Sequence, residues 1–434
     1  MQYLPNILFA ILLIAGIGFF TKNVKKLIRN IKLGKSIDRS DHSKQRWANM
    51  INIALGQSKM VRRPVSGILH IIVYVGFIII NIEVLEIIID GLLGTHRVFS
   101  FLGGFYGFLI SAFEILALLV LIAVIIFWWR RMALRIPRFW NKEMKGFPKN
   151  DALYILYFEM VLMSLFLIMN STDAHFQQAN TGNIISQFIS PLFANTSVET
   201  LHLIERSAWW LHIAGILVFL NYLYYSKHLH ILLAFPNTYF ANLNTKGKLD
   251  NLQSVTDEVQ MMLDPNIDPF AAPVETENDK IPEKFGAEDV FDLNWVQLLN
   301  AYTCTECGRC TSVCPANITG KELSPRAIMM KTRDRIEEVG KNIDINGHFI
   351  ADGKVLTDTI TSEEIWACTS CNACVEECPV NIDPLSIIID MRRFQVMEKS
   401  AAPQELNAMM TNIENNGAPW QYNQLDRLNW KNEK

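Results

Sequence analysis

The chain has 434 residues and a formal net charge of −3, and 19% of its residues are charged. Residues 1–233 hold 22 Lys and Arg against 12 Asp and Glu, whereas the remainder holds 18 against 31. The length predicts two or three domains, and the charge predicts a basic apolar half followed by an acidic soluble half. Binding to phosphate backbones requires clustered Lys and Arg on an exposed face. We therefore expect no nucleic-acid partner.

Five apolar segments predict transmembrane helices, because each is about as long as a hydrocarbon core of about 30 Å requires. They are residues 4–20, 68–89, 105–129, 152–169 and 208–233. The first has no Lys or Arg before it and a basic run after it, which is the reverse of a secretory signal. We interpret it as a retained helix with its N-terminus outside; a cleaved signal is the alternative.

The charges of the connecting segments predict the orientation. Segments 21–67 and 130–150 hold 12 and 7 Lys and Arg, while 90–104 and 170–207 hold one each. Basic connections stay in the cytoplasm. The sequence therefore predicts a multi-pass protein of the cytoplasmic (inner) membrane with its C-terminal half inside the cell.

The composition divides the chain into four parts. Residues 1–233 form the membrane domain, and residues 234–290, rich in Pro, Asn and Asp, are expected to form a linker. A short amphipathic helix around Trp295 opens a soluble domain at 291–400, and residues 401–434 form a tail.

All eight cysteines lie in two groups between Cys304 and Cys378, and each group has the spacing C-x2-C-x2-C-x3-C-P. This is the spacing of bacterial ferredoxins with two [4Fe–4S] clusters, in which the fourth cysteine of each group binds the other cluster. The residue before a proline is extended, which directs that cysteine away from its own group. The expected ligands are Cys304, Cys307, Cys310 and Cys378 for cluster 1, and Cys368, Cys371, Cys374 and Cys314 for cluster 2. Zinc is a weaker alternative because it favours ligands in pairs. Disulfides are a weaker alternative because the cytosol is reducing.

The segment between the groups has 53 residues, and apolar residues at helical intervals in 325–338 predict a helix. The domain resembles the iron–sulfur subunits of heterodisulfide reductase, glycerol-3-phosphate dehydrogenase and succinate dehydrogenase. Residues 295–315, WVQLLNAYTCTECGRCTSVCP, are more similar to membrane iron–sulfur oxidoreductases that include the electron-transfer flavoprotein:menaquinone oxidoreductases.

This resemblance implies a mainly α fold: a five-helix transmembrane bundle, like the cytochrome b domain of the nitrate reductase gamma subunit, followed by a helix-rich two-cluster ferredoxin domain. In that family a cysteine-rich CCG module completes the unit. No cysteine of this sequence remains for one, so the resemblance implies a CCG-domain partner subunit, an electron-transfer flavoprotein, or both.

Four histidines lie in the predicted membrane helices: His70 in the second, and His212, His228 and His230 in the fifth. A b-type haem needs axial ligands at similar depth on facing helices, and His70 and His230 both lie near cytoplasmic helix ends. Helical phase places His212 and His230 on one face and His228 on the other, which favours His230, with His228 and His212 as alternatives. From the residues alone, interfacial histidines are an equally good explanation.

The segments around His70 and His230, GILHIIVYVGF (67–77) and SKHLHIL (226–232), resemble the corresponding helices of the same family. The resemblance implies haem b bound by His70 and His230. The gamma subunit supplies two ligands from each helix, but position 80, where the second ligand of this helix is expected, is Ile80. A second haem would need His212 and an outer histidine such as His175.

Three acidic residues, Glu83, Glu86 and Asp90, form one stripe on the outer half of the second helix, and Glu114 lies at similar depth in the third. Carboxylates within a bilayer are costly and are functional candidates by default. With His212 they are candidates for a quinone pocket or proton path; helix–helix hydrogen bonds by protonated acids are the alternative.

The sequence thus predicts an oxidoreductase component that relays electrons between a cytoplasmic partner and membrane quinone, with menaquinone favoured. Two alternatives remain: a heterodisulfide- or dithiol-reductase subunit working from quinol, and a non-enzymatic redox-sensing or assembly adaptor. The direction of electron flow depends on potentials set by hydrogen bonds and burial.

Overall fold

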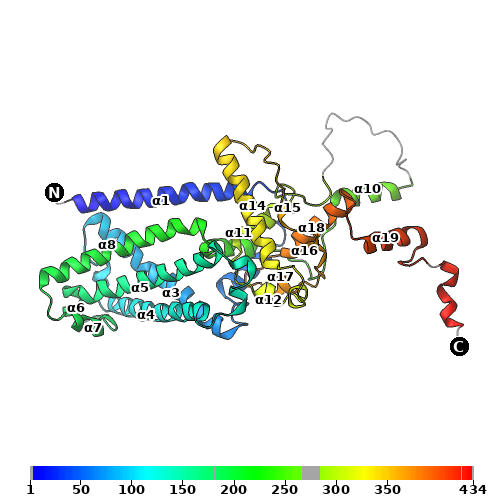
Figure 1. The fold of residues 1–434 in the computed structure, drawn as a ribbon. Helices are drawn as coiled ribbons and strands as arrows, with labels where there is room; N and C mark the ends of the chain where they lie inside the picture. Colours follow the sequence, from blue (N-terminus) through cyan, green and yellow to red (C-terminus); the bar gives the residue numbers. More distant parts are fainter. Residues whose placement is uncertain (1–2, 180, 266–283, 422, 433–434) are drawn as a thin grey trace.

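The computed structural model describes residues 3–179, 181–265, 284–421 and 423–432. These residues form helices and loops without a β-strand, arranged as a long bundle at one end and a compact helical domain beside it (Figure 1). A single isolated bridge pairs Lys35 with Asn294 in the described residues. The mainly α fold predicted from the sequence is confirmed.

Five helices of the described residues are long and apolar enough to cross a membrane. They are α1 (Leu4–Ile31), α3 (Pro64–Leu93), α4 (Gly104–Met132), α5 (Phe147–Thr172) and α8 (Val198–Tyr222). Helices α3, α4, α5 and α8 pack in sequence, and α1 lies against α8 and α3. The first four predicted spans each lie within one of these helices.

Glycines allow close helix contacts in this bundle. A Cβ at Gly76 would lie 2.5 Å from the Val120 side chain, and one at Gly91 would lie 2.7 Å from the Phe9 ring. Small residues bring backbones together where burial of apolar surface provides no driving force between helices in lipid. These contacts join α3 to α4 and α1.

Short elements connect the membrane helices. At the end nearest the second domain are α2 (Ser43–Met50), η1 (Ile51–Leu55), η3 (Pro137–Phe139) and η4 (Lys142–Met144). At the far end are η2 (Val98–Leu102), α6 (Ala174–Ala179), α7 (Ser186–Ile189) and η5 (Ser190–Phe193).

The fifth span differs from the prediction of one helix over 208–233. Helix α8 ends at Tyr222, and the chain continues through η6 (Leu223–Tyr225), η7 (Lys227–Leu229) and α9 (His230–Tyr239). Ser226 is extended, with φ −109° and ψ 147°, and its side chain accepts a hydrogen bond from His228 N. The Asp151 carboxylate accepts from Tyr222 Oη at 2.6 Å and Lys227 N at 3.1 Å. The predicted helical phase between His212 and His230 is therefore wrong.

The predicted linker, 234–290, contains regular structure. It begins within α9 and includes α10 (Gln253–Leu263); residues 266–283 lie outside the described residues. Ala287 and Val290 are buried in the core of the second domain, so packing of that domain already includes the end of the predicted linker.

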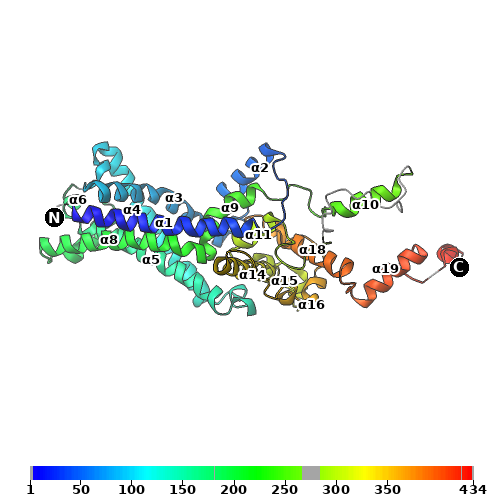
Figure 2. The same ribbon diagram turned by 90° about the horizontal axis from the view of Figure 1, so that it is seen from above.

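The second domain is helix-rich. It comprises α11 (Trp295–Thr303), α12 (Arg309–Ser312), α13 (Pro315–Ile318), α14 (Pro325–Asn346), α15 (Leu356–Thr359), α16 (Ser362–Trp366), α17 (Ala373–Glu377) and α18 (Pro384–Met397). The predicted helix at 325–338 forms the first part of α14. The tail contains α19 (Gln404–Asn416) and η8 (Gln424–Lys431), which extend away from both domains (Figure 2).

A charged cluster fixes α14 within this domain. The Arg335 side chain is 3% exposed and pairs with Asp289 at 2.9 Å and Asp352 at 2.6 Å. It also donates to Lys354 O at 2.7 Å. The guanidinium therefore joins α14 to two separate loops.

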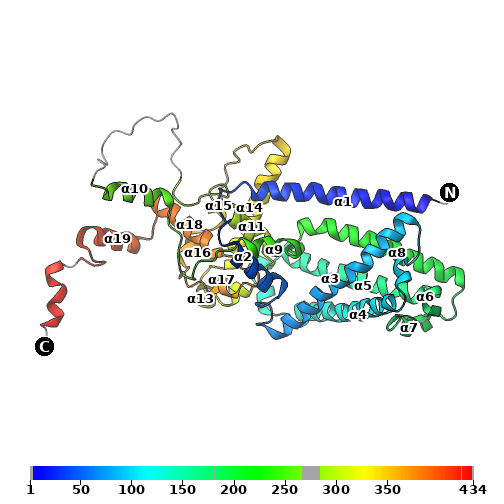
Figure 3. The same ribbon diagram turned by 180° about the vertical axis from the view of Figure 1, so that it is seen from behind.

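The two domains share one buried interface. Leu27 and Leu223 of the membrane domain belong to the same apolar cluster as Val290 and Ile336 of the second. The end of α1 nearest the second domain meets α11 and α14, as Figure 3 shows. There Asn30 donates to Tyr302 Oη at 2.9 Å. This packing holds the second domain directly against the membrane bundle.

Candidate functional site

The first cysteine group forms a loop that folds back on itself after α11. Glu306 and Gly308 both have positive φ, 53° and 69°. A Cβ at Gly308 would lie 2.5 Å from Arg326 Nη1, so the buried guanidinium leaves room only for glycine. Arg326 itself donates to Arg138 O at 2.6 Å and pairs with Glu143 at 2.7 Å.

The second cysteine group repeats this backbone. Ser370 and Asn372, which follow Cys368 at the same offsets as Glu306 and Gly308 follow Cys304, have φ of 55° and 60°. Asparagine tolerates the left-handed region better than most residues. The sequence repeat of cysteines therefore corresponds to a repeat of loop conformation.

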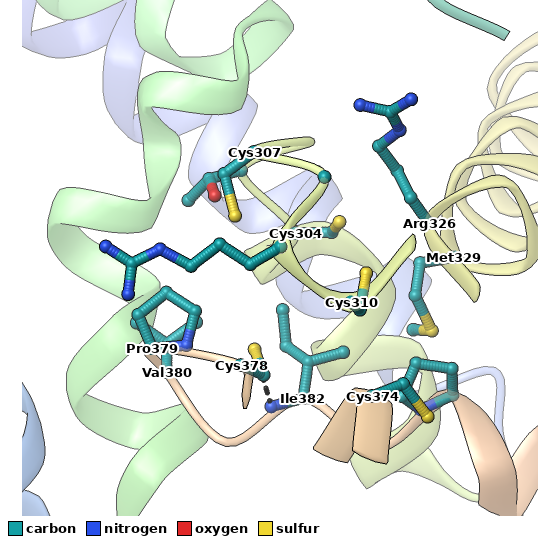
Figure 4. Close-up of a pocket in the computed structure, with 14 residues that line it drawn as sticks. Cys304, Cys307, Cys310, Arg326, Met329, Cys374, Cys378, Pro379, Val380 and Ile382 are labelled. Atoms are coloured by element: carbon teal, nitrogen blue, oxygen red, sulfur yellow. Dashed lines mark hydrogen bonds between the residues drawn. The ribbon is translucent and has the colours of Figure 1, made fainter. Parts of the chain in front are cut away.

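The structure brings two cysteines of the second group, Cys374 and Cys378, to the first. A cavity is lined by Cys304, Cys307, Cys310 and Cys378, with Cys374 at the same cavity (Figure 4). In the described residues no three Cys, His, Asp or Glu side chains converge on a single ion; these thiols instead surround a space.

Burial in this cavity makes the thiolate form costly. It raises the pKa of Cys304 to about 12 and that of Cys378 to about 11. Thiolates in such surroundings need cations beside them, which metal coordination supplies. Ile382 N also donates to Cys378 Sγ at 3.3 Å. The donor set therefore fits an iron–sulfur cluster, whose potential depends on such hydrogen bonds.

The other four cysteines are less enclosed. Cys314 and Cys374 are buried, Cys368 is partly buried and Cys371 is exposed. Burial raises the pKa of both Cys368 and Cys374, and the nearby Cys314 adds to the effect on each. Cys314 thus lies beside the second group, and this site reaches the protein surface.

Two of the predicted haem ligands face each other. The ring centroids of His70 and His230 are 6.4 Å apart, with 39° between the ring planes. Imidazoles that share one metal ion through bonds of about 2 Å have ring centres about 6 Å apart. His230 Nδ1 lies 3.1 Å from Lys227 O, which leaves Nε2 for a ligand. The pair fits the axial positions of a haem.

His228 and His212 have different surroundings. The His228 ring lies 5.3 Å from that of His230, and its Nε2 is 3.8 Å from Glu159 Oε1. His212 Nδ1 lies 3.0 Å from Leu162 O, and its ring packs on Phe166. Glu159 could not be predicted from the sequence, because its contact with His228 depends on the turn at Ser226.

A second cavity lies at the far end of the bundle, lined by Glu83, Glu86, Asp90, Thr95, His96, Arg97, Asp173, Glu205, Arg206 and three apolar side chains. Asp173 pairs with Arg97 at 2.9 Å. Glu86 accepts hydrogen bonds from Phe99 N at 2.8 Å and Tyr106 Oη at 3.0 Å. Arg97 and Asp173 could not be predicted from the sequence as cavity residues, since both lie in connecting segments without a motif.

Glu83 and Glu114 differ in their partners. Glu83 is 3% exposed, and its Oε2 has no hydrogen-bond partner in the described structure. Glu114 accepts from Asn170 Nδ2 at 3.1 Å, Ile185 N at 2.7 Å and Ser186 N at 3.0 Å. The structure therefore places Glu83 and Glu86, but not Glu114 or His212, at this second cavity.

Comparison with known proteins identifies the cysteine-rich part. Residues 303–382 match the model of the 4Fe-4S dicluster domain. The result agrees with the two cysteine sites described above and supports the presence of iron–sulfur clusters.

Relatives match nearly the whole chain. It is 30% identical over 463 residues to the probable iron-sulfur-binding oxidoreductase FadF of Bacillus subtilis, covering 98% of this chain and 61% of FadF. It is 24% identical over 463 residues to the EtfAB:quinone oxidoreductase of Syntrophomonas wolfei, covering 99% of this chain and 60% of that protein. The chain thus spans about three fifths of the length of these two relatives.

A third relative matches part of the chain. It is a probable membrane-anchored ferredoxin of Chromohalobacter salexigens, 33% identical over 172 residues, which are 35% of this chain and 25% of that protein. No solved structure matches the chain. The predicted resemblance to membrane iron–sulfur oxidoreductases is confirmed, and the relatives support an oxidoreductase component anchored in a membrane.

Proposed function

We propose that the chain relays electrons between a cytoplasmic partner and membrane quinone, with menaquinone favoured. Two [4Fe–4S] clusters and haem b would carry the electrons. The observation that carries the proposal is the position of the first cysteine cavity, directly against the segments that bear His70 and His230.

Three hydrogen bonds support this proximity. Arg309, which lines the cavity, donates to Lys59 O at 3.1 Å and Met60 O at 3.2 Å, just before α3 and His70. Asn237 of α9 donates to Val380 O at 2.8 Å, and Val380 also lines the cavity. Helix α9 begins at His230. The proposed cluster and haem sites therefore share their supporting segments.

The ligand assignment follows the crosswise arrangement. Cluster 1 would be held by Cys304, Cys307, Cys310 and Cys378, and cluster 2 by Cys368, Cys371, Cys374 and Cys314. The haem would be held by His70 and His230 and would supply one-electron transfer within the membrane. Since Cys371 is exposed, cluster 2 is the site at which a soluble partner exchanges electrons.

The charge distribution supports a cytoplasmic position for the ferredoxin domain. Arg29 and Arg63 from the first basic segment, and Arg138 from the second, contact that domain. Both basic segments thus lie at its end of the bundle, as expected for cytoplasmic connections of an inner-membrane protein. The N-terminus would then lie outside.

Proton exchange for the quinone would use the second cavity, which contains Glu83 and Glu86 at the far end of the bundle. Quinone reduction takes up two electrons and two protons, and an unpartnered buried carboxyl such as Glu83 can donate or accept a proton. Glu83 follows His70 by 13 residues on α3, about 20 Å along the axis. Protons and electrons would therefore reach the quinone from opposite sides of the membrane domain.

The partner would be a CCG-domain iron–sulfur subunit, an electron-transfer flavoprotein, or both. The similarity to a named EtfAB:quinone oxidoreductase over 99% of the chain supports this choice. It favours quinone-linked transfer over the alternatives of a heterodisulfide-type subunit and a non-enzymatic adaptor.

Purification of the full chain with its partners tests the proposal. We expect about eight iron atoms per chain, a haem b band in the reduced-minus-oxidised spectrum, and reduction of the clusters by menaquinol or their reoxidation by menaquinone. Zinc in place of iron would refute the clusters. Clusters that do not respond to either quinone form would favour the adaptor.

A further inference from the structure

Glu306 is a buried acidic residue inside the first cysteine loop, between Cys304 and Cys307. Its side chain is 2% exposed and contacts two cations, the Lys227 ammonium and Arg333 Nη1, the latter at 2.8 Å. Arg333 belongs to α14 of the same domain, but Lys227 belongs to the membrane domain. The carboxylate therefore joins the cysteine loop to both.

Lys227 connects this loop to His230. Its side chain is 8% exposed, and its Nζ donates to Glu306 and also to Pro148 O at 2.5 Å. Its backbone N donates to Asp151 at 3.1 Å, and its carbonyl lies 3.1 Å from His230 Nδ1. Every polar group of Lys227 is thus used, and one of them orients the proposed haem ligand.

Because this pair is buried, its main contribution is to fix the geometry of the interface rather than to stabilise it. Removing charges from water costs much of what their attraction returns, so apolar packing could stabilise the interface equally well. Hydrogen bonds to a charged group, by contrast, fix the angle and distance of their partners. A residue that orients an axial imidazole through its free nitrogen also tunes the metal.

We propose that Glu306 and Lys227 form a positioning pair, which holds the first cysteine site and the His230 imidazole in one fixed arrangement. The inference rests on the proposed function in its assignment of cluster 1 and haem b. Electron transfer between them requires constant separation, and the pair provides the shortest polar connection described above between the two sites.

The test compares Glu306→Gln, Lys227→Met and the double variant in the purified full chain. The readouts are the EPR g values of the haem, the EPR signal of each cluster and the rate of haem reduction after the clusters are reduced. A displaced His230 imidazole changes the distance between the two redox centres, so we expect haem reduction to slow severalfold. The double variant should be no slower than the worse single variant, because both remove one interaction.

Lys227→Met should also change the haem g values, which depend on imidazole orientation, while the signal of cluster 2 stays unchanged. Asp344→Asn is the matched control. It removes a pair with Lys26 and Arg29 at the same interface, but those side chains are about 30% exposed. It should match the wild type in every readout.

Glu306→Asp, with its charge kept and its reach shortened by one carbon, serves if a neutral variant loses iron. It should hold wild-type iron and still slow haem reduction. Wild-type rates in the iron-replete variants, or additive effects in the double variant, would overturn the positioning pair alone. A wild type without haem would overturn both this inference and the haem part of the proposed function.

Discussion

Replacing Cys378 with alanine is expected to remove the cluster of the first cysteine group, although Cys378 belongs to the second group in the sequence. The reason is geometric, because Cys378 lines the cavity formed by Cys304, Cys307 and Cys310. The substitution removes one of four proposed thiolates and the hydrogen bond from Ile382 N.

The size of the effect follows from the two-site arrangement. Loss of one [4Fe–4S] cluster removes four of about eight iron atoms, so iron should fall to about half. Cys314→Ala should cause the same loss from the other site. The assay is iron per chain together with the EPR spectrum of the reduced protein, which distinguishes the remaining cluster.

Comparison of the EPR signals of the cysteine variants shows which cysteines bind the same cluster. The signal left in Cys378→Ala should match that left in Cys304→Ala, and the signal left in Cys314→Ala should match that in Cys368→Ala. Thr305→Ser, at the rim of the same cavity, is the control and should keep both signals. If Cys378→Ala instead resembles Cys368→Ala, each group binds its own cluster and the geometric argument fails. Cys378→Ser is a milder change if alanine empties both sites.

Three further outcomes follow from the structure. His70→Ala should abolish the haem b absorbance while iron stays at about eight per chain, whereas His212→Ala should retain the haem band; loss in both would place His212 among the ligands. Glu83→Gln should slow quinone turnover with the clusters intact, while Glu199→Gln, an exposed change in the first turn of α8, should not; equal turnover in both would exclude Glu83 from proton exchange. Arg335→Met should lower the stability of the second domain by about 1.5–3 kcal/mol, because Asp289 and Asp352 lose their charged hydrogen-bond donor; an unchanged denaturation midpoint would contradict this.

The long apolar helices and the paired cysteine loops could be predicted from the sequence, since each depends on local pattern. Apolar length predicts α3 and α4 regardless of their neighbours. The spacing of the thiols predicts the loops because the backbone must wrap a compact cluster.

The end of the fifth helix could not be predicted in this way. Tyr222 to Leu233 contains no proline or glycine, so the apolar run suggested one continuous helix. The break depends on Asp151, which is distant in sequence and binds both sides of it. His70 and His230 nevertheless face each other, because the turn at Ser226 brings His230 back toward α3.

The partners of buried charges were also beyond sequence analysis. The cysteine motif assigns no role to Glu306, and only the fold brings Lys227, 79 residues earlier, beside it. Similarly, the stripe of Glu83, Glu86 and Asp90 gave no sign that Glu83 alone would keep an unpartnered oxygen. Such distinctions arise only from tertiary contacts.

The packing of α1 has a consequence for biogenesis. At the end of α1 nearest the second domain, Asn30 binds Tyr302, which is 272 residues later in the sequence. Lys26 and Arg29 of the same end pair with Asp344. Contacts between such distant segments form late, because the intervening chain must first exist and be closed into a loop. The contacts of α1 with the second domain can therefore form only after Tyr302 and Asp344 have been synthesised, whereas those with α3 can form earlier.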